Sequence, residues 1–261
     1  MAEQSISKNR IGQIRSLHQK KFREESRLFI AEGRKVVAEL LASGYEVKSL
    51  VATESYFSTA DRSLSDRVDE LLVAKEEDFS KLSALSTPQD VLAVARIPSE
   101  ELKVSDFKGK FSVLLDDVRD PGNLGTILRI AHWFGAAQVV TSLNSVDAYN
   151  PKVVQASMGS LFHVPVHAIG LEGLLTQIRS ETDIPVYAAL MEGEDLYHAS
   201  LTKEGILIFG NESMGIRTSL QELSHRKITI PSGELVPGNR PESLNVAISA
   251  ALVLAAFRHQ A

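Results

Sequence analysis

The sequence predicts an α/β protein: a parallel-sheet domain preceded by a second, smaller α/β domain. Three observations carry this prediction. Short apolar runs alternate with amphipathic stretches along nearly all of the 261 residues, which is the pattern of strands and helices in turn. The apolar runs of the second half are continuous, as expected for strands that are covered on both faces. A polar stretch that contains Pro98 and lacks apolar periodicity separates the two halves.

The N-terminal domain is expected to span 1–97, the linker 98–110 and the C-terminal domain 111–261. A basic helix over 8–28 comes first, because Ile11, Ile14 and Leu17 share one apolar face. A helix that opens at 33 and stops at Gly44 is expected next, together with one at 78–85 and strands at 28–31, 47–52, 71–74 and 91–95. No residue pattern in this domain indicates chemistry of its own.

The C-terminal domain is expected to alternate strands and helices until a long final helix. We predict strands at 111–115, 137–141, 164–168, 185–189, 206–209 and 227–230, and helices at 126–134, 151–159, 171–179 and 243–259. The last helix is apolar nearly all round, which predicts that it is buried.

Composition excludes several classes of protein. The chain is 44% hydrophobic and 23% charged, which is ordinary for a globular protein and argues against disorder. No apolar run approaches the ~18–20 residues of a membrane span, and the first residues do not form a secretory signal. The absence of cysteine excludes disulfides and thiolate chemistry, and the seven histidines lack metal-ligand spacing. We therefore expect a cytoplasmic protein with neither a membrane span nor a metal site.

Charge is distributed unevenly along the chain. The net charge of −5 divides into +5 for residues 1–36 and −10 for the rest. Within the basic segment, Lys20, Lys21 and Arg23 surround Phe22. Such a segment favours an anionic partner, although a solvated helix face would have the same composition.

Polar, glycine-bearing loops follow three of the predicted strands. Asn123, Gly125 and Arg129 follow the first strand of the C-terminal domain, the segment 210–215 follows the strand at 206–209, and 243–245 opens the last helix. Ligands bind beyond the carboxyl ends of parallel strands, so these loops are the candidate site. Taken singly, each has a purely structural interpretation: Asn123 and Ser243 can cap helices, and Arg129 can pair with Asp116 or Asp117.

Familiar nucleotide-binding motifs are absent. The first loop reads GNLG rather than G-x-G-x-x-G, and no acidic residue ends the second strand of this domain. There is no phosphate-binding P-loop, nucleophile elbow or H-E-x-x-H motif either. A nucleotide-dependent oxidoreductase is therefore disfavoured.

The same loops resemble the three motifs of the SpoU (TrmH-like) RNA ribose 2′-O-methyltransferases of the SPOUT superfamily. Motif one, N-x-G-x-x-x-R, corresponds to 123–129, motif two, G-N-E-x-x-G, to 210–215, and motif three, S-L-N-V, to 243–246. Upstream, 29–33 (FIAEG) and 86–91 (STPQDV) look like the N-terminal substrate-binding domain of the family. Asp90 departs from the glycine that many relatives have there, so the turn is expected to differ.

The resemblance implies fold, cofactor and assembly. It implies a C-terminal domain with a deep trefoil knot, a homodimer, and an S-adenosylmethionine site in the knot loops. The implied cofactor-binding residues are Gly210, Asn211, Gly215, Ile230, Gly238, Ser243 and Leu244. In the glycine positions we expect the missing Cβ to allow the cofactor close to the backbone.

The implied reaction is methylation of a ribose 2′-hydroxyl in structured RNA, ribosomal RNA rather than transfer RNA. The implied catalytic residues are Arg129, Asn123, Glu212, Ser243 and Asn245. Arg129 could act as a base or by stabilising charge on the hydroxyl oxygen, and the high pKa of a guanidinium favours the latter. Lys20, Lys21 and Arg23 are expected to bind RNA phosphates. The rival interpretation is a non-catalytic RNA-binding protein on the same scaffold.

Overall fold

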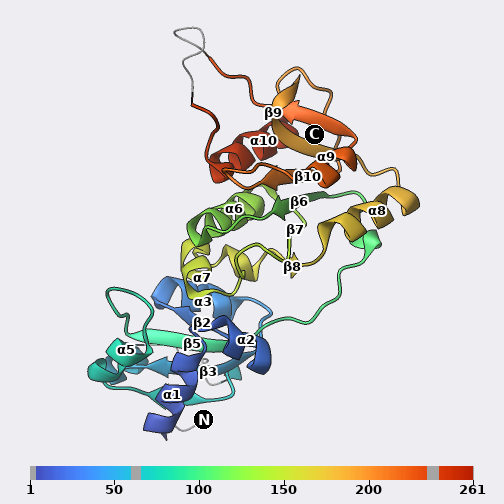
Figure 1. Ribbon diagram of the computed structural model, residues 1–261. Helices are drawn as coiled ribbons and strands as arrows, with labels where there is room; N and C mark the ends of the chain where they lie inside the picture. The colour runs from blue at the N-terminus through green and yellow to red at the C-terminus, as the bar shows by residue number, and fades with distance from the viewer. Residues whose placement is uncertain (1–3, 60–65, 234–240, 261) are drawn as a thin grey trace. The chain divides into compact units, whose positions relative to one another are not determined.

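The computed structural model describes residues 4–59, 66–233 and 241–260, and the chain divides into two compact units (Figure 1). The N-terminal unit consists of 1–100 and 147–163, and the C-terminal unit of 101–146 and 164–261. This division differs from the predicted one, which placed 147–163 in the C-terminal domain. The predicted linker also differs, because Phe107 in its short 3₁₀ helix η2 (Val104–Phe107) is buried in the core of the C-terminal unit.

The N-terminal unit is built on a mixed five-stranded sheet. From edge to edge the strands are β1 (Gln4–Ser5), β4 (Leu71–Val73), β3 (Val47–Ala52), β5 (Val91–Arg96) and β2 (Leu28–Glu32). The first three run parallel, and β5 is antiparallel to both of its neighbours. The carboxyl ends of these strands therefore lie at two opposite edges of the sheet.

The predicted basic helix over 8–28 is two helices, α1 (Lys8–Ser16) and α2 (Lys20–Ser26). The guanidinium of Arg23 explains the break: it donates hydrogen bonds of 2.8 and 2.9 Å to the carbonyls of Leu17 and His18. Carbonyls at a helix end need such partners. The other helices of this unit are α3 (Arg34–Ala42), α4 (Glu54–Thr59), α5 (Glu76–Leu82) and α7 (Pro151–Ser157).

Residues 147–163 are held to the N-terminal unit by an ion pair and an aromatic cluster. Asp147 Oδ2 accepts from Arg23 Nη2 at 2.6 Å and from Nε at 2.9 Å, and the Arg23 side chain is only 2% exposed. The aromatic cluster comprises Phe29, Tyr45, Tyr149 and Phe162, with ring centroids 4.9 to 6.1 Å apart. Burial among these rings raises the pKa of Tyr149.

The turn at Asp90, which was expected to differ from that of relatives with glycine, is held by a side-chain ion pair. Asp90 has no positive φ, so the turn does not need glycine. Its carboxylate instead binds Arg34, with Nη2 to Oδ2 at 2.5 Å and Nε to both oxygens at 3.1 Å.

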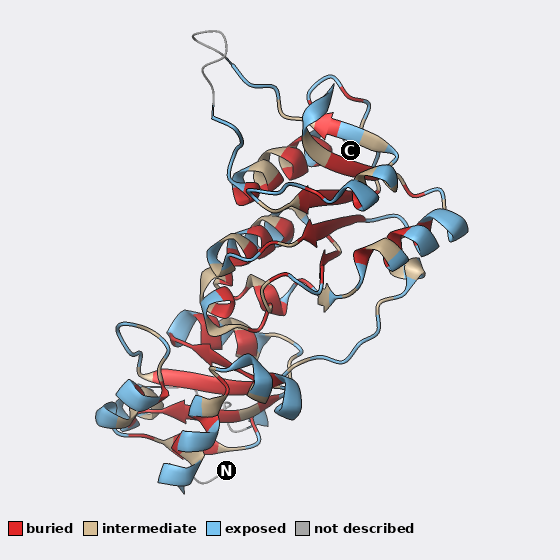
Figure 2. Ribbon diagram, in the orientation of Figure 1, coloured by how far each residue is buried: buried red, intermediate tan, exposed pale blue. Residues whose placement is uncertain are grey.

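The C-terminal unit confirms the predicted parallel sheet. Its order is β11 (Arg226–Thr229), β9 (Val186–Asp195), β10 (Gly205–Gly210), β6 (Phe111–Asp116), β7 (Gln138–Thr141) and β8 (Val166–Ala168), and every neighbouring pair is parallel. The central strands β6 and β10 are buried almost throughout (Figure 2). Their carboxyl ends meet, because Gly210 pairs with Asp116.

Helices cover both faces of this sheet. Side chains of α8 (Leu171–Glu181) pack with Leu114, Ile206 and Ile208 on one face. On the other face, Phe257 of α10 (Val246–Gln260) meets the rings of Phe111 and Tyr187 edge-on, and α10 packs against α6 (Pro121–Phe134). The short α9 (Thr218–Glu222) completes the unit. In the described ranges no helix is long and apolar enough to cross a membrane.

The predicted burial of the last helix holds for one side of α10. Ala250, Val253 and Phe257 are buried, whereas Ile248 is 52% exposed. Residues 234–240 lie outside the described residues, and the trefoil knot stays a prediction.

Candidate active site

The helix that carries the first motif begins earlier than predicted. Asp120 is the N-cap of α6, accepting a 2.8 Å hydrogen bond from the backbone NH of Asn123, and Pro121 is the first helical residue. Proline suits this position because its missing NH would be unpaired there. Asn123 is thus not the cap, and its side chain is free to bind elsewhere.

Asn123 joins the other two motifs through its side-chain amide. Its Nδ2 donates a hydrogen bond to Glu212 Oε1, and its Oδ1 accepts one from Asn245 Nδ2 at 2.9 Å. These residues are 89 and 122 positions away from Asn123 along the chain. The structure therefore brings together one polar side chain from each of the three motifs.

Asn245 caps the last helix as well as binding Asn123. Its Oδ1 accepts hydrogen bonds from the backbone NH groups of Ala247 at 2.9 Å and Ile248 at 3.3 Å. Both ends of its amide are therefore used, one for the start of α10 and one for the network. Ser243, for which capping was the purely structural interpretation, is exposed, and its side chain forms no hydrogen bond with the other residues that the structure describes.

Asn211 organises the loop of the second motif. Its backbone NH and carbonyl pair with the carbonyl and NH of Gly215, and its Oδ1 accepts from the NH groups of Ser213 and Met214. Its Nδ2 reaches across to the carbonyl of Asp117 at 2.9 Å. Asp117 has a φ of +59°, a conformation rarely found outside glycine. The two loops that follow β10 and β6 are therefore tied together.

Gly210 and Gly215 in this loop are glycine for different physical reasons. A Cβ on Gly210 would lie 2.2 Å from the backbone of Gly215, so glycine is needed for the loop to close on itself. Cofactor approach, the reason predicted from the sequence, is not required to explain it. Replacement of Gly210 by valine would therefore disturb the loop itself. Gly215 has a φ of +68° and open space around its missing Cβ.

Arg129 differs from the other charged groups near these strand ends. It is exposed on α6, and its side chain forms no hydrogen bond or ion pair with any other described residue. The partners considered for it from the sequence are taken: buried Asp116 binds Arg217, with Nη2 to Oδ1 at 2.7 Å, and Asp117 binds Arg119. Arg129 is thus a cation without a structural task in this unit.

Arg217 is a residue that the sequence reasoning missed. It donates to Asp116 from its backbone NH and its Nε, and its Nη1 binds Glu172 at 2.6 Å. The hydrogen bond to Asp116 raises the pKa of Arg217. Arg217 therefore holds the segment after Gly215 to the end of β6. The acidic strand end at Asp116 was visible in the sequence, but no local pattern indicated which arginine would meet it.

The remaining predicted cofactor residues differ in how far their side chains are exposed. Ile230 is half-buried just beyond β11, and Leu244 is 46% exposed. Met214, which was not among the predicted residues, is 84% exposed in the loop of the second motif. Exposed apolar side chains at strand ends beside unhindered backbone suit a ligand with an apolar ring and polar edges, as S-adenosylmethionine has. Gly238 lies outside the described residues. No group of three His, Asp or Glu side chains in the described ranges could hold a metal.

The predicted RNA-binding cations do not act alike. Arg23 is a correction: its guanidinium is buried and binds Asp147 and two carbonyls, so it does not face solvent. Lys20 and Lys21 are exposed, each with a glutamate one helical turn away at 3.6 and 3.8 Å. They stay predicted phosphate contacts.

Comparison with known proteins identifies the family. The model of the SpoU rRNA Methylase family matches residues 110–255, and that of the MRM3-like substrate binding domain matches 8–93. The chain is 30% identical over 252 residues to the Bacillus subtilis 23S rRNA (guanosine(2553)-2'-O)-methyltransferase RlmP, covering 96% of each chain.

Solved structures agree with this assignment. An AdoMet-bound rRNA methyltransferase from Sinorhizobium meliloti matches with a TM-score of 0.85 at 30% identity, covering 99% of this chain and 97% of that one. A TrmH-family protein from Porphyromonas gingivalis matches with a TM-score of 0.88 at 37% identity, covering 98% and 99%. With its three motifs joined by Asn123, the chain belongs to the SpoU rRNA methylase family.

Proposed function

We propose that this protein is an RNA 2′-O-ribose methyltransferase that uses S-adenosylmethionine and acts on ribosomal RNA. The observation that carries the proposal is the polar network of Asn123, Glu212 and Asn245 at the carboxyl end of the parallel sheet, with the unpaired Arg129 on the same helix as Asn123. Family membership supports the same reaction, because the Bacillus subtilis relative that matches 96% of this chain is named as a 23S rRNA 2′-O-methyltransferase.

The reaction requires a weak nucleophile to become reactive. When bound, S-adenosylmethionine supplies a methyl group on a positively charged sulfur, which leaves as a neutral thioether. The 2′-oxygen forms the new bond to carbon and its proton passes to solvent. The protein must therefore stabilise negative charge that develops on that oxygen, and a preorganised cation is suited to this.

Arg129 supplies that cation. A guanidinium has a pKa above ~12 and stays protonated, so it stabilises the oxygen by charge and hydrogen bonding rather than by removing the proton. Because no carboxylate in the described residues neutralises Arg129, its full charge is available to the substrate.

The network residues position the loops. Asn123 fixes the Glu212 carboxylate through one oxygen, which leaves the other oxygen available to orient the ribose or Arg129. Asn245 holds the start of α10, and Ser243 and Leu244 stand exposed just before it. The backbone of 210–215 together with Ile230, Ser243 and Leu244 would hold the cofactor, and we expect Gly238 to join them.

The experiment is transfer of labelled methyl from S-adenosylmethionine to unmodified ribosomal RNA, followed by nuclease digestion and identification of the 2′-O-methyl nucleoside. A thermal-shift comparison of S-adenosylmethionine with NAD accompanies it. We expect stabilisation by S-adenosylmethionine alone and one modified nucleotide. Cofactor binding without transfer to any RNA would favour the non-catalytic RNA-binding protein, and stabilisation by NAD alone would favour an oxidoreductase.

Assembly and location complete the proposal. Trp133 on α6 is 84% exposed and Ile248 on α10 is 52% exposed, and these helices pack against each other. Large exposed apolar side chains mark interaction surfaces, so we propose that a second copy of the chain covers them in a cytoplasmic homodimer whose C-terminal segment is knotted. Light scattering of the wild type beside Trp133→Glu tests the dimer, because a new charge in the interface should give monomers.

A further inference from the structure

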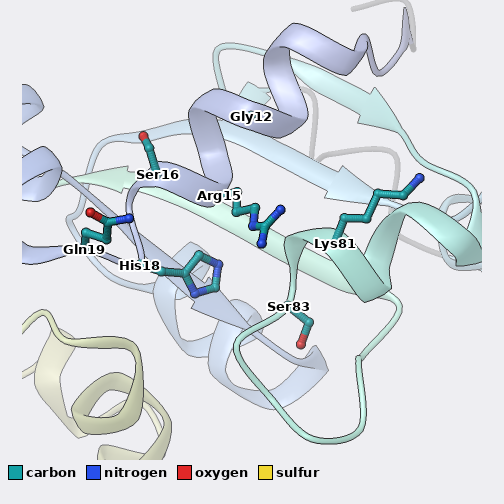
Figure 3. Close-up of a pocket in the computed structure, with 7 residues that line it drawn as sticks. All are labelled: Gly12, Arg15, Ser16, His18, Gln19, Lys81 and Ser83. Atoms are coloured by element: carbon teal, nitrogen blue, oxygen red, sulfur yellow. The ribbon is translucent and has the colours of Figure 1, made fainter.

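A hollow of about 540 Å³ lies in the N-terminal unit (Figure 3). It is lined by Gly12, Arg15, Ser16, His18, Gln19, Lys81 and Ser83. The first five belong to α1 and the turn after it, and the last two to the end of α5 and the turn that follows. No carboxylate lines the hollow, whereas two permanent cations do.

The two walls of the hollow share one hydrophobic core. Ile11, Ile14 and Leu17 of the first wall pack in the same buried cluster as Phe79 and Leu82 of the second. The His18 ring adds a polar link, since its Nε2 lies 2.7 Å from the carbonyl of Leu82. A carbonyl only accepts, so Nε2 carries the hydrogen. The spacing of the walls is therefore fixed before any ligand arrives.

A buried carboxylate holds the loop at the edge of the hollow. Glu32 is 5% exposed, and its oxygens accept from Ser83 Oγ at 2.5 Å and from the backbone NH groups of Ala84 and Gln89 at 3.3 Å. This residue belongs to the FIAEG stretch, for which the sequence indicated no chemistry. The structure gives it the role of shaping the loop that ends one wall.

The two cations of the hollow differ in how far they are neutralised. The side chain of Arg15 is exposed and forms no ion pair or hydrogen bond with other described residues, in contrast to Arg10, which binds Glu70, and Arg23, which binds Asp147. Lys81 is exposed, and its Nζ donates a hydrogen bond to Asp78 Oδ1 at 3.2 Å. The exposed face of α2 carries two lysines and two glutamates, so its net charge is zero.

We propose that this hollow binds the phosphodiester backbone of the RNA substrate, with Arg15 and Lys81 as phosphate contacts. The inference rests on the proposed function and names the part of the N-terminal unit that holds the RNA. The volume lies in the range of about 300–1,000 Å³ that is typical of small-molecule binding pockets, far more than a single phosphate needs. Ser16, Gln19 and Ser83 add neutral polar groups that suit a sugar–phosphate chain.

The first test measures RNA affinity across a salt titration for wild type and Arg15→Gln/Lys81→Gln. Each lost phosphate contact should flatten the slope of log affinity against log salt by about 0.7–0.9. The slope of the double variant should therefore be flatter than that of wild type by up to about 1.4–1.8. The matched control is Lys35→Gln/Lys75→Gln, which removes the same charge from exposed positions of the same unit. The control should keep the wild-type slope.

The second test fills the hollow without removing any contact. Gly12 lies in α1 and a Cβ there would meet nothing within 4 Å, so larger residues fit without distortion. Gly12→Glu and Gly12→Gln introduce side chains of equal size, one charged and one neutral. A carboxylate beside Arg15 should weaken RNA binding at low salt by roughly fivefold or more relative to the Gln variant, and melting temperatures should match.

The outcomes separate this inference from the proposed function. If wild type binds S-adenosylmethionine and methylates RNA but all variants keep its salt slope and affinity, the hollow is not the RNA site and the enzyme assignment stands. The same holds if Lys20→Gln/Lys21→Gln flattens the slope more than Arg15→Gln/Lys81→Gln does. If inorganic phosphate binds the hollow but does not change the affinity for RNA, the hollow binds free anions and the inference fails. If wild type neither binds the cofactor nor transfers methyl, the proposed function fails by itself.

Discussion

The two units of this chain use polar side chains in opposite ways. In the N-terminal unit, charged groups such as Arg23, Glu32 and Arg34 bind carboxylates or backbone groups and hold their own unit together. In the C-terminal unit, polar side chains gather at one edge of the sheet, and Arg129 remains unpaired among the described residues.

Strand direction explains the difference. Six parallel strands direct all their carboxyl ends, and the loops that follow, to one edge, so residues from distant segments meet there. The mixed sheet of the N-terminal unit sends its loops to both edges, because β5 runs against β3 and β2. A parallel sheet therefore builds a reaction site from loops, whereas the mixed sheet offers separate surfaces.

The largest expected effect is on stability, at the buried arginine of the N-terminal unit. Arg23→Ala should lower the free energy of unfolding by about 3–5 kcal/mol, because it leaves Asp147 and two carbonyls without their partner. Urea unfolding followed by circular dichroism measures this. Lys21→Ala on the same helix is the control and should stay within about 0.5 kcal/mol of wild type. Equal losses in both variants would contradict the structural role of Arg23.

Substitution of Arg129 in the C-terminal unit should affect the rate of methyl transfer rather than stability. Arg129→Ala should slow methyl transfer by about 10²–10³-fold, since one preorganised charge donor is lost. Its melting temperature should not change, because the Arg129 side chain forms no ion pair or hydrogen bond with other described residues. Single-turnover kinetics with saturating RNA measure the rate, and calorimetry should find cofactor affinity within a few-fold of wild type. A variant that methylates at the normal rate would remove Arg129 from the site.

Asn245 has two roles, capping α10 and donating a hydrogen bond to Asn123, and two substitutions can separate them. Asn245→Ala loses the helix cap and should cost about 0.5–2 kcal/mol of stability as well as activity. Asn245→Asp keeps oxygens for the NH groups of Ala247 and Ile248 but loses the donor to Asn123, so stability should hold while methyl transfer falls. Thermal melts and methylation rates of the two variants, compared directly, measure the division. Equal activity in wild type and the Asp variant would make the bond to Asn123 merely structural.

The smallest expected effect is a pH dependence in the N-terminal unit. The hydrogen bond from Arg34 lowers the pKa of Asp90 below its ordinary value. The pair therefore contributes its stability above the ordinary aspartate pKa and loses it as pH falls through the lowered value. The free energy of unfolding of wild type should exceed that of Asp90→Asn by up to about 1 kcal/mol near neutral pH, and this difference should disappear in acid. A difference that is the same at all pH values would rule out this ion pair as its source.

The sequence was sufficient for most of the strands and helices and for the three loops whose polar side chains the structure brings together. Continuous apolar runs between helices predicted the parallel sheet, and polar loops after three strands predicted where the motifs would lie. Both rest on local patterns, because hydrophobic period and turn residues act over a few positions. The family resemblance added the reaction, which no local pattern supplied.

Only the tertiary structure decided which polar groups meet. Asp120 rather than Asn123 caps α6, and that frees Asn123 to join Glu212 and Asn245. Arg23, one of the predicted RNA contacts, turned out to bind Asp147, 124 residues away, and Phe107 of the predicted linker is buried in a core. A side chain's local pattern shows that it needs a partner, but the partner is set by strand order and register, which bring together residues more than a hundred positions apart.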